Sequence, residues 1–85
     1  MIWTLTTTAA PAERMFVGPQ ATLIISGTWT GVVTIKLLLS DGTWQALEPT
    51  FTTNTVQAMR LESNGWVQPV FTTATSGTVT VEIRG

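Results

Sequence analysis

Apolar and polar residues alternate along several short stretches of this chain, which is the pattern of β-strands with one buried and one solvent-facing side. The two clearest stretches are 32–39 and 78–84. The apolar residues that share one face are Val33, Ile35, Leu37 and Leu39 in the first stretch and Val79, Val81 and Ile83 in the second. Each stretch therefore predicts a strand.

Turn-forming residues separate these stretches. Asp41-Gly42 lies between 32–39 and a second segment, 43–47. Because Asp and Gly tolerate positive φ, this pair predicts a two-residue hairpin turn. Ser76-Gly77 predicts a turn before the last strand, and glycines bound the segment 27–31 that leads into the first one.

Three further strands are expected at 2–8, 21–26 and 66–72. Their threonines, valines and isoleucines are branched at Cβ, which favours strands over helices. Pro69 lies inside the last of the three, and because proline has no backbone N–H, it indicates a sheet edge or a bulge there.

The stretch 54–62 fits two structures. It fits a short helix, because Asn54 is a suitable N-cap and Gly65 follows the end. It also fits a strand, because its residues alternate. The strand is favoured, since Asn64-Gly65 would then form a second hairpin turn.

About seven short strands with turns every 8–12 residues predict an all-β protein, a single small antiparallel β-sandwich of the immunoglobulin-like or jelly-roll-like kind. The chain has 85 residues, which allows one domain with a thin core. We expect residues 21–85 to form the sandwich. Residues 1–20 carry a strand and a loop and are a candidate interaction arm that adds a strand to a neighbour.

The composition then limits the function. The chain has no cysteine and no histidine, which removes disulfides, thiolate nucleophiles, the usual zinc ligands and the commonest general base. A formal net charge of -1 gives no electrostatic reason to bind nucleic acid or an anionic membrane. We therefore expect a protein that is not an enzyme and that binds no cofactor, metal, nucleic acid or membrane.

The remaining polar residues support this expectation. Asp41 belongs to a turn, and Glu82 lies two residues from Arg84 on the same face of the last strand. The sole lysine, Lys36, is not spaced to activate a serine. An enzyme would need carboxylates that converge from distant positions. The four cations do not cluster in the sequence: Arg14, Lys36, Arg60 and Arg84.

The surface is expected to be unusually apolar. Charged residues make up 11% of the chain, below the ~25% of ordinary soluble domains. The mean hydropathy is +0.29. The chain begins without a basic segment and has no apolar run near ~20 residues, so we expect a soluble protein made in a cytoplasm, without a signal peptide. Such a surface is best explained if other chains cover part of it.

The four tryptophans have two interpretations. Trp3, Trp29, Trp44 and Trp66 could form a platform for sugar rings, or they could fill the core and an oligomer interface, which is favoured. Trp44 is expected in the core, because it follows the hairpin turn. The residues expected at an interface are Trp3, Trp29, Val32, Leu38 and Trp66.

Two segments carry a resemblance to a known group of proteins. They are SGTWTGVVTIKLLLSDGTWQAL at 26–47 and TSGTVTVEIRG at 75–85. In the first, a glycine-bounded tryptophan opens a strand that is similar to the type GTVTLQ, and an Asp-Gly-x-Trp hairpin follows. The second is a final strand of the type SGTVTVxI. The chain resembles small β-sandwich proteins of tailed bacteriophages in these motifs, although the three consecutive leucines at 37–39 replace polar positions usually found there.

This resemblance implies a virion structural protein, located in the virion, with the major capsid protein as its partner. The expected role is a capsid decoration (cement) protein that binds and stabilises the assembled phage head. A homo-oligomer is expected, with a trimer favoured because trimers suit the local three-fold axes of a capsid. The alternative is a tail or fibre component that binds glycans for attachment.

Overall fold

The computed structural model describes residues 1–9, 11, 13–47, 50–61 and 64–85, and it confirms an antiparallel all-β protein. Six strands form one sheet. Their bounds are β1 (Ile2–Leu5), β2 (Met15–Val17), β3 (Gln20–Leu38), β4 (Trp44–Ala46), β5 (Thr55–Arg60) and β6 (Gly65–Arg84). Among the described residues, none forms a helix that is long and apolar enough to cross a membrane.

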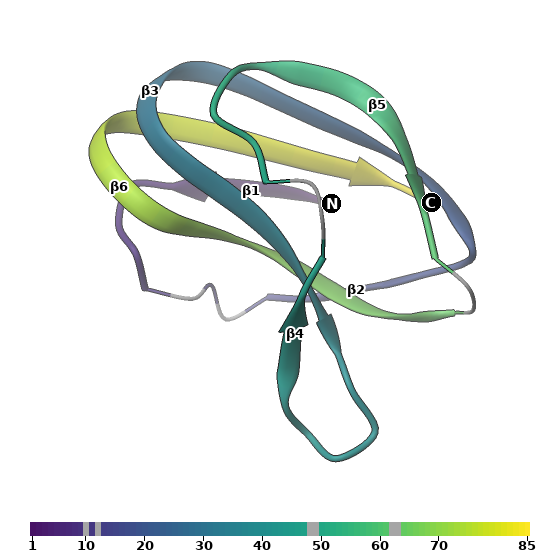
Figure 1. Ribbon diagram of the computed structural model, residues 1–85. Coiled ribbons are helices and arrows are strands. Elements are labelled where there is room, and N and C mark those ends of the chain that lie inside the picture. Colours follow the sequence, from purple (N-terminus) through teal and green to yellow (C-terminus); the bar gives the residue numbers. More distant parts are fainter. Residues whose placement is uncertain (10, 12, 48–49, 62–63) are drawn as a thin grey trace.

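The sheet folds over on itself into two layers, because its two long strands bend near their middle (Figure 1). β3 and β6 pair from Thr22 opposite Arg84 to Leu37 opposite Val67. Layer 1 consists of β1, the C-terminal half of β6, the N-terminal half of β3, and β5. Layer 2 consists of β2, the N-terminal half of β6, the C-terminal half of β3, and β4.

The expectation of about seven short strands is wrong in number and length. The predicted strands 21–26 and 32–39 are both part of β3, and 66–72 and 78–84 are both part of β6. The segments 27–31 and 76–77 are therefore continuous strand rather than turns. The glycines in these segments bend the two strands, but β3 and β6 stay paired through the bend.

Two glycines make the bend sterically possible. Gly77 has φ +85°, and a Cβ there would collide with the backbone carbonyl of Thr28 on β3. Gly31 has φ +147°, and a Cβ there would collide with the carbonyl of Thr73 on β6. The β3–β6 register also shifts between Thr30 and Gly31, which is the mark of a β-bulge. The bend thus depends on close backbone approach as well as on positive φ.

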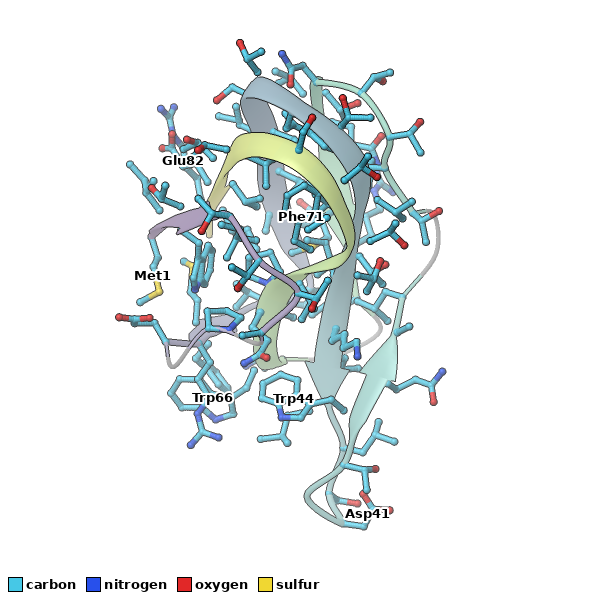
Figure 2. The ribbon with its side chains drawn as sticks, turned by 90° about the vertical axis from the view of Figure 1, so that its left-hand side faces the viewer. Met1, Asp41, Trp44, Trp66, Phe71 and Glu82 are labelled. Atoms are coloured by element: carbon cyan, nitrogen blue, oxygen red, sulfur yellow. The ribbon has the colours of Figure 1, made fainter. Side chains whose placement is uncertain are left out.

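The core lies between the two layers and contains the apolar faces that the alternation predicts. Phe71 is fully buried there and lies between the layers in Figure 2. The buried apolar residues form one cluster, to which all the strands except the short β4 contribute: Trp3, Leu5, Val17, Leu23, Ile25, Val33, Ile35, Phe51, Met59, Val67, Phe71, Val79, Val81 and Ile83. A single core therefore holds both layers together.

The hairpin around Asp41 is confirmed, but its loop has three residues rather than two. The amide of Leu39 donates to the carbonyl of Thr43 at 2.7 Å, and the amide of Gly42 donates to the carbonyl of Leu39 at 3.0 Å. Gly42 has φ +90°. This is the type of three-residue loop in which a glycine in the left-handed region follows a tight turn.

The ambiguous stretch 54–62 forms a strand over Thr55–Arg60, as favoured, but the expected hairpin at Asn64-Gly65 is wrong. β5 pairs with β3 in layer 1, whereas β6 begins in layer 2. The chain therefore crosses between layers after β5. The edge or bulge expected at Pro69 is not seen: β6 is an inner strand, and its register with β3 shifts elsewhere. Proline is accommodated because Ile35, opposite it, accepts a hydrogen bond from the amide of Leu47 on its other side at 2.8 Å.

The N-terminal segment belongs to the same sheet. β1 and β2 both pair with β6, and Trp3 and Leu5 are in the core. The indole N–H of Trp3 donates to the carbonyl of Glu13 at 3.1 Å, which ties the connection between β1 and β2 to the core. β1 is shorter than the strand expected at 2–8. Both strands of the segment are therefore part of the chain's own sheet.

Candidate functional site

A line of large apolar side chains crosses the outer face of layer 2, one from each strand. Phe16 of β2 pairs with Trp66 of β6, and Leu38 of β3 pairs with Trp44 of β4. Leu37 pairs with Val67, so the next positions along the two strands, Leu38 and Trp66, are neighbours on the outer face. We call Phe16, Trp66, Leu38 and Trp44 the aromatic row.

The aromatic row faces away from the core because its neighbours in sequence face inward. Val17 and Val67 are buried, so Phe16 and Trp66 point outward, where they are 52% and 38% exposed. Figure 2 shows Trp44 and Trp66 near the end of the molecule from which the Asp41 hairpin extends. Large apolar side chains in such numbers on one face are expected to be covered by a partner.

Contacts among these residues hold the exposed rings in place. The rings of Phe16 and Trp66 meet edge to face, with centroids 5.3 Å apart. The guanidinium carbon of Arg14 lies 4.8 Å from the centre of the Trp66 ring, a cation–π contact. Contacts with Phe16 and Arg14 thus hold the Trp66 ring in place, so less side-chain freedom is lost when a partner covers it.

A groove of about 720 Å³ continues from the aromatic row around the open end of the sandwich. Gly65 is part of its wall, and a Cβ there would lie 2.7 Å from Cδ1 of Leu37. Apolar residues dominate the lining, which includes Phe16, Leu37, Leu38, Leu39, Leu47, Leu61 and Trp66. The row and the groove together make one apolar surface with Arg60, Ser40 and Asn64 among its polar members.

The structure brings together two of the five residues expected at an interface, Leu38 and Trp66. Trp3 lies in the core. Trp29 lies within the bend of β3, where its ring meets Phe71 edge to face at 5.8 Å and its indole N–H donates to Oδ1 of Asn54 at 2.8 Å. Val32 is half-buried beside the same bend. These three residues stabilise the fold at their positions.

Trp44 was expected in the core, and that expectation is wrong. A two-residue loop at Asp41-Gly42 would pair Trp44 with Leu39, on the inner face. The three-residue loop shifts the pairing by one position, so Trp44 faces Leu38 on the outer face. A shift of one residue moves a whole strand's side chains to the opposite face. Phe16 was also missed, because the short strand β2 has no visible alternation.

Among the described charged residues, Arg14 and Arg60 lie at this surface, and Lys36 is on the same outer face of layer 2, two positions from Leu38 on β3. Nε of Arg84 bonds to Oε2 of Glu82 at 2.6 Å on the exposed face of β6, as their spacing predicts. The hydroxyl and amide of Thr43 both donate to Asp41, and these bonds lower the pKa of its carboxyl group. Within the described residues, no three acidic side chains gather where they could hold a metal ion.

No protein-family model, curated protein sequence or solved structure matches this chain. The likeness to phage β-sandwich proteins therefore stays a prediction from the sequence motifs.

Proposed function

We propose that this protein is a non-enzymatic virion structural protein, a decoration (cement) protein that binds the assembled head of a tailed phage. The observation that supports this role best is the aromatic row. Four large apolar side chains on one outer face, in a chain with only nine charged residues, favour a protein used as a contact surface. The phage head as partner comes from the motifs at 26–47 and 75–85.

The composition of the row suits binding to another protein. Trp, Phe and Arg are enriched in protein–protein interfaces, and a few such residues carry most of the binding energy. Trp66, Phe16 and Arg14 form one contact cluster. Full burial of an aromatic side chain stabilises a complex by roughly 1.5–3 kcal/mol. The row can therefore supply affinity without any chemical step.

Stabilisation of a shell follows from this kind of binding. A protein that binds only the assembled shell stabilises it by mass action, because each bound copy must dissociate before the shell can come apart. The aromatic row on the outer face of layer 2 can lie against the capsid surface, where many copies would each contribute one contact. The major capsid protein is the proposed partner.

The first experiment is quantitative mass spectrometry of phage particles purified from the source of this chain. Copies in simple ratio to the major capsid protein would support the decoration role. Absence from the particles would refute a virion protein altogether. A few copies per particle would refute decoration and favour a tail or fibre component.

The second experiment tests the aromatic row itself by co-sedimentation with heads that lack the protein. Trp66→Ala should weaken binding by about 30-fold or more, since loss of a central aromatic anchor costs about 2 kcal/mol or more. Ile2→Ala is the matched control, because Ile2 is 62% exposed on the outer face of layer 1. Equal binding by Trp66→Ala and the native protein would refute the row as the docking surface.

The exposed rings of the row also suit the second candidate function, glycan binding by a tail or fibre component. Sugar rings stack on exposed aromatic faces, and Trp66 offers one beside Phe16. A titration of tryptophan fluorescence with candidate polysaccharides distinguishes the two functions. Saturable quenching that Trp66→Ala removes would support the glycan function, and a flat response would support the contact surface.

A further inference from the structure

The edge strand β5 has unpaired backbone groups along its outer side. β5 lies at the margin of layer 1 in Figure 1, and within the described part of the chain it pairs with β3 alone. With six residues it is the longest of the edge strands, since β1 has four and β2 and β4 have three each. An edge of this kind is a template for another strand.

The register identifies the unpaired groups. The amide of Leu61 donates to the carbonyl of Pro19 at 2.8 Å, one position beyond the pair Arg60–Gln20. In an antiparallel pair, successive residues turn their backbone groups alternately toward and away from the neighbouring strand. Val56, Ala58 and Arg60 therefore turn their amides and carbonyls away from β3, to the open edge.

Most of the usual protection of an edge strand is missing from β5. Natural edges are blunted by proline, charged side chains, bulges or inward-pointing charges. β5 contains no proline, its register with β3 is continuous, and its one charged residue, Arg60, is the last of the strand. Val56, in its first half, is the most exposed of the large apolar residues, at 72%. An uncovered edge of this length would be a site of aggregation unless a specific strand pairs with it.

We infer that β5 pairs with β5 of a second copy of this chain, antiparallel across a two-fold axis, so that the two layers 1 form one continuous sheet. This inference is independent of the proposed function, and it differs from the trimer that the resemblance to phage proteins favours. In one register, Ala58 faces its own copy and Val56 faces Arg60 of the other chain. All three outward-turned residues of each β5 then lie opposite outward-turned residues of the other β5. No other antiparallel register of the two strands pairs all three.

The side chains fit this register. Ala58 is small and lies on the axis, where two large side chains would collide. The aliphatic stem of Arg60 can cover Val56 of the other chain while its guanidinium stays in water. The two Arg60 residues are four positions apart along the paired strands, roughly 13 Å at ~3.3 Å per residue. That distance exceeds the Debye length of about 8 Å, so the two charges do not oppose the pairing.

A second feature of the same edge supports a partner there. A cavity of about 130 Å³ opens beside β5, between the two layers. Its lining is mostly apolar and includes Leu23, Ile35, Leu47, Phe51 and Met59. A second copy on β5 would shield this opening from water, which adds apolar burial to the backbone hydrogen bonds.

The test is sedimentation velocity of the full chain over a range of concentrations, with amide hydrogen exchange. We expect a dimer of twice 9.2 kDa, and slow exchange at Val56, Ala58 and Arg60 that becomes fast on dilution. Val56→Lys places a cation opposite Arg60 of the other chain and should raise the dissociation constant at least tenfold. Val56→Glu places an anion there and should leave the constant within about threefold of the native value.

Ile2→Lys is the matched control, because Ile2 is an exposed apolar residue on the same face at the opposite edge, and it should dimerise normally. Ala58→Pro removes an outward amide that β3 does not use, so the monomer should keep its far-UV circular dichroism while the dimer is lost. A monomer at every concentration, a trimer, or equal effects of Val56→Lys and Val56→Glu would each overturn the inference.

Discussion

The bend of the long strands can be tested with three glycines that differ in what an added methyl group would meet. Gly77 has φ +85° and no room for a Cβ, because the backbone of Thr28 and Trp29 lies against it. Gly42 has φ +90°, but nothing lies within 4 Å of its Cβ position. Gly18 is outside the left-handed region, and its nearest neighbour, Oδ1 of Asn64, would be 3.7 Å away.

The expected change in the free energy of unfolding on each Gly→Ala substitution follows from these environments. Gly42→Ala carries only the backbone strain of positive φ, about 1–2 kcal/mol. Gly77→Ala carries the same strain plus the cost of moving the β3 backbone, a further 1–3 kcal/mol or about 2–5 kcal/mol in total. Gly18→Ala should be neutral or stabilising by up to about 1 kcal/mol, because alanine reduces the freedom of the unfolded chain.

These differences are large for a chain of this size. At about 0.05–0.15 kcal/mol per residue, the whole domain is stable by roughly 4–13 kcal/mol. Since 1 kcal/mol corresponds to about 4–8 °C in a small domain, Gly77→Ala should lower Tm by about 8 °C or more. Urea unfolding, followed by tryptophan fluorescence, should rank the three glycine variants in the same order of stability, provided that the slope m is the same for all of them. Equal destabilisation by Gly77→Ala and Gly42→Ala would refute close backbone contact as the cause of the glycine requirement.

Two further predictions concern the core and the hairpin. Phe71→Ala should lower the free energy of unfolding by about 3–5 kcal/mol, because Phe71 is fully buried. Phe16→Ala should change it by less than about 1 kcal/mol, because half of Phe16 is exposed. Equal losses for the two variants in urea unfolding would contradict the assigned core. The hydrogen bonds from Thr43 hold the pKa of Asp41 below 3.8 in the folded chain, so the stability that they supply is present above about pH 4 and is lost as the pH falls through the folded pKa. Thr43→Val keeps the amide donor but removes the hydroxyl, so an NMR titration of the Asp41 carboxyl should give a pKa part of the way back to 3.8, and an unchanged midpoint would exclude the hydroxyl as a cause.

Alternation predicted most of the buried positions correctly where a strand was long enough to show it. Leu23, Ile25, Val33 and Val79 are all in the core. It did not predict that Leu39 is 38% exposed, or that Gln68 and Val70, on the opposite face of β6 from Val67, are buried. The prediction failed where backbone geometry decides the outcome. Glycines that read as turns before 32–39 and 78–84 instead bend continuous strands, because each lies opposite a partner strand that keeps its hydrogen bonds. A glycine allows positive φ in either setting, so its presence does not distinguish the two.

The candidate site shows the same division. The composition predicts that part of the surface is apolar. The sequence also places Leu38 and Trp66 at an interface. Phe16 and Trp44 joined them only through the register of β2 with β6 and of β4 with β3. For Trp44, one extra residue in the hairpin loop decided between core and surface.

The sequence by itself determined that this is a small all-β protein with few charges and which faces of its main strands are buried, because these depend on side-chain chemistry and on a period of two residues. Only the tertiary structure decided that one sheet folds into two layers, that a row of aromatic side chains crosses one of them, and that β5 is left with an open edge. These features depend on which strands pair and in which register. Pairing is a long-range choice among many strands of similar composition, and local patterns do not encode it.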